Sequence, residues 1–150
     1  MRTLSPVIIA MVLAFQVGCT VSAPTSRTAP ATATIDQKER RYHPHVFGAR
    51  VGQTIEIVNS DPTLHNIHAM PKGNQEFNTG QPIQGMKTTH TFTQKEVMVP
   101  FKCDVHGWMN AFVGVLDHPY FAVTKDDGKF ELKGLPPGTY TVEAWHEKLG

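Results

Sequence analysis

The segment with the clearest chemistry runs from Cys103 to Met109. It carries a thiol at Cys103, an imidazole at His106 and a thioether at Met109, so that soft or nitrogen donors recur at three-residue intervals. Gly107 and the flanking runs of β-branched residues favour a tight loop between two strands over a helix. Because such a loop can curl its side chains around one point, we predict that it forms part of a metal site.

A second imidazole precedes this loop in the chain. His65 follows a strand-like run and the turn residues Asn59-Ser60-Asp61-Pro62, so its ring enters from another part of the sheet. Two imidazoles, a thiolate and a thioether suit copper that cycles between two oxidation states. Zinc is the main alternative, but structural zinc sites are closed sets of Cys and His ligands. A binuclear copper centre needs a second loop cysteine, and the loop has none. The prediction is one copper ion bound by His65, Cys103, His106 and Met109.

Other histidines and methionines are weaker ligand candidates. In an extended strand His68 points to the opposite side from His65. His43 and His45 alternate onto one strand face, where we expect a solvated surface. Three further methionines compete for the axial position, and the loop spacing alone favours Met109. They are Met70, Met86 and Met98.

The elements that must hold these ligands are predicted to be strands. After Arg41, short runs of β-branched and aromatic residues alternate with Gly, Pro, Asn and Asp, and no stretch keeps helical spacing. We therefore predict an all-β protein with a β-sandwich. The expected strands cover residues 45–49, 53–59, 66–70, 88–93, 97–103, 111–116, 121–124, 129–133 and 140–145.

The two ligand segments resemble the cupredoxin family of blue-copper proteins. The Cys-x2-His-x2-Met loop has the short spacing of amicyanin, and His65-Asn66 is similar to the amicyanin and plastocyanin segment in which asparagine follows a histidine ligand. The resemblance runs from about Phe47 to Leu116, and Gly107 departs from it because amicyanin has proline there. It implies a Greek-key sandwich, a type 1 copper ion that carries single electrons, and an Asn66 side chain that ties the two ligand loops together.

Several function classes are disfavoured. The sequence has no G-x-S-x-G elbow, phosphate-cradling loop or H-E-x-x-H helix, which favours a carrier over an enzyme. A formal charge of +1 gives no signature of nucleic-acid binding. The expected partners are redox proteins, cytochrome-like or oxidase-like. Two alternatives stay open: a copper carrier or buffer that hands over its metal, and a structural β-module in which the metal is a staple.

The first 19 residues have the features of a secretion leader. Arg2 is followed by an apolar stretch from Val7 to Val17, which is too short to span a bilayer. Its end, Val17-Gly18-Cys19, resembles the bacterial lipoprotein signal, in which the cysteine is acylated; cleavage after Ala23 is the alternative. We predict a leader over 1–19, a lipid anchor on Cys19 and a periplasmic or cell-envelope location. A linker rich in Ser, Thr, Ala and Pro is expected over 20–37.

Beyond the copper domain, predicted over 38–118, residues 119–150 are expected to add a β-hairpin segment. Asp126-Asp127-Gly128 suits a hairpin turn, and Pro136-Pro137-Gly138 suits a second turn. The run from Thr124 to Trp145 resembles about two hairpins of the carboxypeptidase-regulatory-like, transthyretin-like module.

Overall fold

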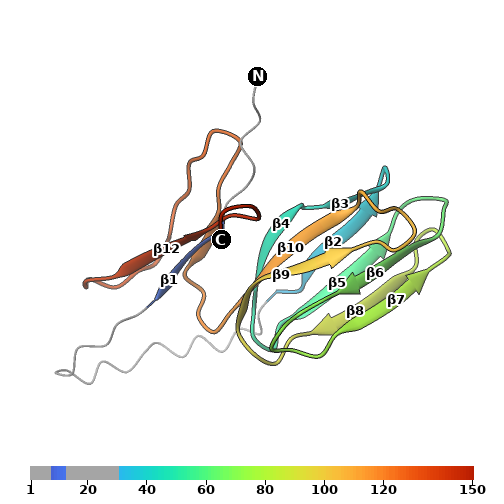
Figure 1. Cartoon of the computed structure of the whole chain (residues 1–150). Coiled ribbons are helices and arrows are strands. Elements are labelled where there is room, and N and C mark those ends of the chain that lie inside the picture. The colour runs from blue at the N-terminus through green and yellow to red at the C-terminus, as the bar shows by residue number, and fades with distance from the viewer. Residues whose placement is uncertain (1–7, 13–30) are drawn as a thin grey trace.

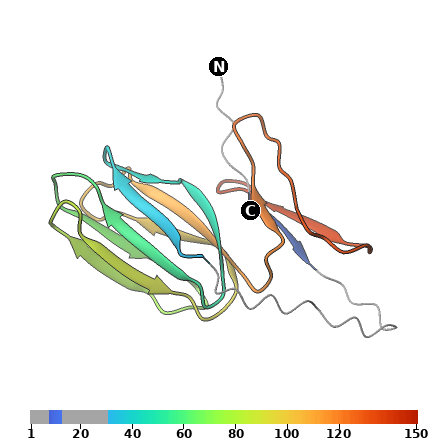
Figure 2. The same ribbon diagram turned by 180° about the vertical axis from the view of Figure 1, so that it is seen from behind.

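The computed structural model describes residues 8–12 and 31–150, and within these ranges it contains strands and no helix (Figure 1). Two sheets face each other, and a smaller third sheet lies beside them (Figure 2). The predicted all-β sandwich is therefore confirmed. Among the described residues there is no helix long and apolar enough to cross a membrane.

The larger sheet of the sandwich has five strands and carries the metal-site residues at one end. In spatial order they are β4 (Val46–Arg50), β10 (Asn110–Leu116), β9 (Glu96–Lys102), β6 (His65–Ala69) and β7 (Phe77–Gln81). β4 and β10 are parallel, and the other neighbours are antiparallel. Because β6 and β9 are antiparallel, the start of β6 lies beside the end of β9, which brings His65 next to the loop after Lys102.

The facing sheet has four strands, in the order β3 (Arg41–His43), β2 (Ala33–Lys38), β5 (Thr54–Asn59) and β8 (Lys87–Thr91). Side chains alternate between the faces of a strand, so that Ile35, Ile55 and Ile57 are buried against the larger sheet. Phe92 and Phe101 stack in the core with ring centroids 6.2 Å apart. Cys103 and Met109 belong to the same buried apolar cluster, so the metal-site end is continuous with the core.

The third sheet consists of β11 (Phe121–Val123), β1 (Ile8–Val12) and β12 (Thr141–Trp145), with β1 in the middle. It packs against the β4 edge of the sandwich: a Cβ on Gly48 would lie 2.0 Å from the Phe121 ring, so only glycine fits there. A Glu147 carboxylate oxygen lies 2.8 Å from His45 Nε2 and links the last residues to the sandwich.

The folded region begins earlier than we predicted. The linker was expected to end at Gln37, but β2 starts at Ala33, and Ile35 and Gln37 are fully buried. The last five residues of the predicted linker are thus a strand. They were missed because a buried glutamine interrupts the apolar alternation that marks a strand. The rest of the linker up to residue 30, together with Cys19, lies outside the described residues.

The C-terminal hairpin prediction is wrong in part. The turn forms, with Lys125 N–H bonded to the Lys129 carbonyl at 3.0 Å and Gly128 at φ 77°. The expected strand over 129–133 does not form, and β11 pairs with β1 instead. β1 belongs to the predicted leader, so removal of the leader would leave β11 and β12 without the strand between them. The leader and the carboxypeptidase-regulatory-like resemblance stay predictions.

Glu96 anchors the loop between β6 and β7. Its carboxylate accepts hydrogen bonds from Lys72 N at 2.5 Å, Gly73 N at 2.9 Å and Asn74 Nδ2 at 3.2 Å. Burial alone would raise the pKa of Glu96, but these hydrogen bonds outweigh burial and lower it. A lowered pKa in the folded state stabilises the protein above the unfolded pKa of about 4.3, and this stabilisation is lost as pH falls through the folded value.

Glu96→Gln is therefore expected to lower the free energy of unfolding at pH 7 by about 1–3 kcal/mol, because its amide NH2 group faces backbone N–H donors. The difference from the wild type should shrink below about pH 4, where the glutamate becomes protonated. Urea unfolding at pH 7 and pH 3 measures both effects. Glu131→Gln, at an exposed ion pair with Lys133, is the matched control and should change little. Equal losses for Glu96→Gln at both pH values would contradict this role.

Candidate metal centre

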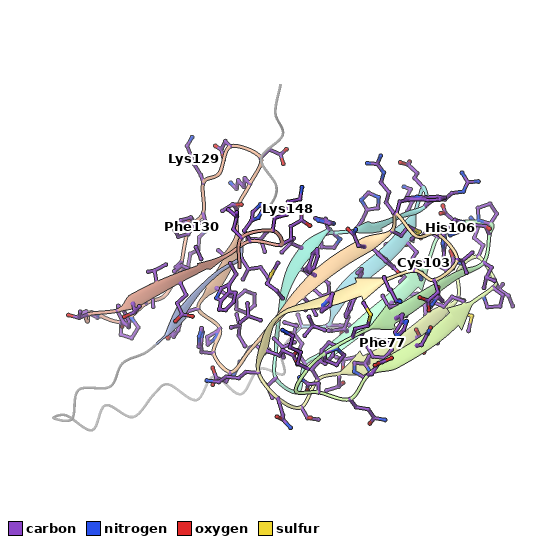
Figure 3. All side chains as sticks on the ribbon, in the orientation of Figure 1. Phe77, Cys103, His106, Lys129, Phe130 and Lys148 are labelled. Atoms are coloured by element: carbon purple, nitrogen blue, oxygen red, sulfur yellow. The ribbon has the colours of Figure 1, made fainter. Side chains whose placement is uncertain are left out.

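The structure brings three of the four predicted ligands together. The ligand atoms of His65, Cys103 and His106 all lie within 4.8 Å of one another. The two Nδ1 atoms of His65 and His106 are 3.0 Å apart, and Cys103 Sγ lies 3.8 Å from His106 Nδ1. Figure 3 places Cys103 and His106 at the end of the sandwich remote from Lys129 and Phe130. In residues 8–12 and 31–150 no other group of His, Cys and acidic side chains forms such a cluster.

Backbone hydrogen bonds close the ligand loop between β9 and β10. Cys103 N donates to the Met109 carbonyl at 3.1 Å, and Met109 N donates to the His106 carbonyl at 2.8 Å. The backbone N–H of His106 also lies 3.4 Å from Cys103 Sγ, in the position of a donor to sulfur. The loop is therefore the tight turn that its glycine and flanking strands predicted, and Cys103 and Met109 face each other across its base.

Burial differs among the four predicted ligands. His65, Cys103 and Met109 are exposed by 1% or less, whereas His106 is half-buried. The Trp108 ring lies edge-on to His106 with centroids 5.3 Å apart and is 65% exposed. His106 and Trp108 therefore form the side of the site that faces solvent.

Asn66 connects the two ligand segments, as the resemblance implied. Its Oδ1 accepts a hydrogen bond from Asp104 N at 2.7 Å and lies 3.2 Å from the Cys103 thiol, while its Nδ2 donates to Asp104 Oδ2 at 3.1 Å. The Tyr42 hydroxyl donates to the Asn66 carbonyl at 2.6 Å, and burial raises the pKa of that phenol. These contacts orient Asn66 from both sides of the sandwich.

Asp61 is the site residue that the sequence analysis missed. Its Oδ2 lies 2.8 Å from His65 Nε2, on the side of the ring opposite the cluster. The same carboxylate accepts hydrogen bonds from the backbone of Glu39 and Arg40, both at 2.8 Å. Burial raises the pKa of Asp61, but the hydrogen bonds from Arg40, His65 and Glu39 together lower it, so the group is a carboxylate at neutral pH. Its signal in the sequence was an acidic residue four positions before His65, a predicted ligand.

The histidines judged weaker lie outside the cluster. His68 is held between Asp104 and Glu76, at 3.0 and 2.8 Å, and does not reach the other rings. Hydrogen bonds from Lys102 and Asn78 are the main causes that lower the pKa of Asp104 to about 2. His43 is exposed, and His45 is the partner of Glu147.

The donor set fits copper. Burial is the main cause that lowers the pKa of His106, and the nearby Arg40 charge lowers it further, which favours the neutral imidazole that a metal ion requires. A single thiol with two imidazoles falls short of the four Cys or His ligands of a structural zinc site. The buried thioether of Met109, at the base of the same loop, is a donor that copper accepts.

Comparison with solved structures identifies the fold. The chain is similar to a copper-containing nitrite reductase from Thermus scotoductus, with 22% identity and a TM-score of 0.55, over 65% of this chain and 25% of that protein. It is also similar to a Cu(I) form of an amicyanin mutant, with 22% identity and a TM-score of 0.50, over 59% of this chain and 86% of amicyanin. No family model and no curated protein matches the sequence.

The protein thus has the cupredoxin fold, as its ligand motifs implied. Within that fold, the His65, Cys103 and His106 cluster at one end of the sandwich supports copper binding.

Proposed function

We propose that this chain is a single-electron carrier with one copper ion held by His65, Cys103 and His106 and by Met109 as a weak fourth ligand. The observation that carries the proposal is the convergence of a buried thiol and two imidazoles within 4.8 Å of one another. A thiolate, two imidazoles and a thioether describe a blue-copper site. Copper bound there would supply one-electron exchange between Cu(I) and Cu(II).

The chain's own residues supply a site that changes little when an electron arrives or leaves. Cys103 and Met109 are linked through the backbone, His65 begins a strand of the central sheet, and Asn66 joins the two segments. Donor atoms fixed in this way do not need to rearrange with the charge of the site. A fixed geometry keeps the reorganisation energy of each electron transfer low.

We further propose that electrons enter and leave through the His106 side. His106 is the least buried of the four proposed ligands, and its neighbours Val105 and Trp108 are 49% and 65% exposed. Leu64, directly before His65, is 44% exposed. An apolar end of this kind suits brief docking of a redox protein, cytochrome-like or oxidase-like, because apolar contacts form without desolvating charges.

Burial argues against the alternative of a copper carrier that hands over its metal. Transfer of a metal ion between proteins needs ligands that a partner can reach, and Cys103 and His65 are exposed by 1% or less. A purely structural metal staple is disfavoured by the apolar core, which already joins both sheets through Phe92, Phe101 and the isoleucines around them.

The function is tested by loading the domain with one equivalent of Cu(II) and recording its visible spectrum and its voltammogram. We expect an intense thiolate-to-copper band and a reversible one-electron couple, with copper retained over many cycles. Loss of copper upon reduction would favour the metal carrier instead. A metal-free protein that still folds and unfolds cooperatively would argue against the structural staple.

Export and membrane attachment are proposed on the basis of the leader sequence. Cys19→Ala is expected to move the protein from the membrane fraction to the soluble fraction, or to leave its leader unprocessed, because the mutant has no thiol to acylate. Fractionation and intact mass measure this. Cys103→Ala, which leaves the leader unchanged, is the control and should stay in the membrane fraction. Membrane attachment that persists in Cys19→Ala would contradict the lipid anchor.

A further inference from the structure

The Asp61 carboxylate sits between one histidine of the cluster and a turn in the facing sheet. Its Oδ2 lies 2.8 Å from His65 Nε2 and 2.8 Å from Arg40 N, and its Oδ1 lies 2.8 Å from Glu39 N. The side chain is 13% exposed. Asp61 N also donates to Asn59 Oδ1 at 3.0 Å, which fixes the start of the loop. One carboxylate therefore contacts a ring nitrogen and two backbone amides at the same time.

The contact between Asp61 and His65 determines which ring nitrogen of His65 carries the proton and which one keeps a lone pair for a metal ion. A carboxylate accepts hydrogen bonds, so His65 Nε2 must carry the proton. His65 Nδ1, which lies 3.0 Å from His106 Nδ1, is then left with its lone pair pointing into the cluster. A carboxylate on the far nitrogen also makes the imidazole a stronger donor. Asp61 thus selects both the orientation and the tautomer of His65 that a metal ion requires.

The contact with the β2–β3 turn stabilises an unusual backbone. The turn has two central residues, Glu39 at φ 56° and Arg40 at φ 53°. Turns of this type normally use Asn and Gly, because a side chain in the left-handed region costs free energy. Here neither residue is Asn or Gly, and the Asp61 carboxylate instead binds both of their N–H groups.

The same turn reaches the other histidine of the cluster. The Arg40 carbonyl accepts a hydrogen bond from Trp108 Nε1 at 3.2 Å, and the Trp108 ring lies edge-on to His106 at 5.3 Å. Asp61 therefore contacts one histidine of the cluster and is linked to the other. It is hydrogen-bonded directly to His65, and it is connected to His106 through the β2–β3 turn and the Trp108 indole.

We propose that Asp61 is the positioning residue of the metal centre. Asp61 sets the tautomer of His65 by a direct hydrogen bond, and it holds Trp108 against His106 by shaping the Glu39-Arg40 turn. The effect of Asp61 on the reduction potential rests on the proposed copper site. The effect of Asp61 on the His65 tautomer does not, because it can be observed in the metal-free protein.

The first experiment uses Asp61→Asn, with Asp117→Asn at an exposed ion pair as the control for lost charge. Asparagine offers one uncharged oxygen to the three N–H groups that the carboxylate binds, so His65 Nε2–H either faces the NH2 group or keeps only an uncharged acceptor. In the metal-free protein we expect the protected Nε2–H signal of His65 to be lost or to shift upfield in the NMR spectrum. With copper bound, Cu(II) affinity should fall about tenfold or more. If Cu(I) affinity is unchanged, tenfold corresponds to a rise of about 59 mV in the potential.

A second pair of variants separates the two contacts. Glu39→Asn with Arg40→Gly gives the turn residues that favour this backbone unaided. In Asp61→Asn alone we expect the turn to loosen and the Trp108 indole N–H, which is bonded to the Arg40 carbonyl, to exchange faster than in the wild type. In the Asn-Gly background, Asp61→Asn should leave the exchange of this indole unchanged, but the His65 signal and the potential should still be altered. This background also keeps the test available if Asp61→Asn alone does not fold.

The proposal is overturned if Asp61→Asn retains the wild-type His65 signal and potential, or if the Asn-Gly turn restores the potential together with the indole. Either result would make Asp61 a turn cap only. A wild-type protein without a reversible copper couple would refute the proposed function, and the NMR of the metal-free variants would still decide the role of Asp61.

Discussion

Cys103→Ser is expected to abolish the intense visible band of the copper-loaded protein and to weaken copper binding severely. A serine hydroxyl stays protonated near neutral pH and is not a soft ligand, so the site loses the donor that distinguishes copper from other metals. The loss of affinity should exceed the roughly 10–100-fold cost of removing an outer hydrogen-bonding partner of a metal ligand. Absorption spectra and Cu(II) titration against a competing chelator measure both effects.

The fold should survive this substitution. The Cys103 thiol lies 3.2 Å from Asn66 Oδ1, and a hydroxyl in its place finds the same acceptor. We expect the free energy of unfolding of the metal-free protein to change by less than about 2 kcal/mol. Thermal unfolding followed by far-UV circular dichroism checks this. Cys103→Ala is the companion variant, since it removes the ligand without adding a buried hydroxyl. A Cys103→Ser protein that stayed blue would show that another residue supplies the thiolate-like donor.

The part of the candidate metal centre that lies in one loop could be predicted from the sequence, because its donors are close together in the chain. Cys103, His106 and Met109 share one loop, and the spacing of their donors shows which side chains can meet. His65 was added to the predicted ligands because a strand, a turn and a histidine followed by asparagine precede that loop. The structure brings His65, Cys103 and His106 together within 4.8 Å.

Asp61 could not be placed in the same way. An aspartate before proline is typical of a turn, and that interpretation needs no further partner. Its other partners, Glu39 and Arg40, lie 22 and 21 positions away and beside the predicted linker. Only the pairing of β2 with β5 brings that turn to the start of the His65 loop. A contact of this kind depends on sheet order, which composition and spacing do not determine.

The missed strands have a related cause. β2 and β7 each bury a glutamine, Gln37 and Gln81, where apolar alternation would mark a strand. The two glutamine side chains are hydrogen-bonded to each other between the sheets. Gln37 Nε2 and Gln81 Oε1 meet only once the two sheets pack together, so neither residue signals burial in its own segment. β3 was missed because it has three residues, of which Tyr42 alone is buried.

Met109 provides the test that separates an electron-transfer centre from a generic copper trap. Its side chain is 1% exposed and belongs to the same buried cluster as Cys103, so we expect a side chain of similar size at this position to stay buried at the base of the loop. A weak axial ligand tunes the potential more than it holds the metal. His65, Cys103 and His106 should therefore retain copper when Met109 is changed.

Met109→Leu is expected to raise the reduction potential, because an apolar side chain disfavours the more highly charged Cu(II) state. Met109→Gln should lower it, because an amide oxygen is a harder donor that favours Cu(II). Each shift should reach about 59 mV if the relative affinity for the two copper states changes tenfold. The leucine variant conserves volume and should lose less than about 1.5 kcal/mol of stability, so a change in its potential will not reflect unfolding. Voltammetry measures the reduction potential of each variant, and elemental analysis measures the copper that it retains. Equal potentials in both variants, or copper loss from both, would mean that Met109 is not the axial ligand and would direct attention to Met86.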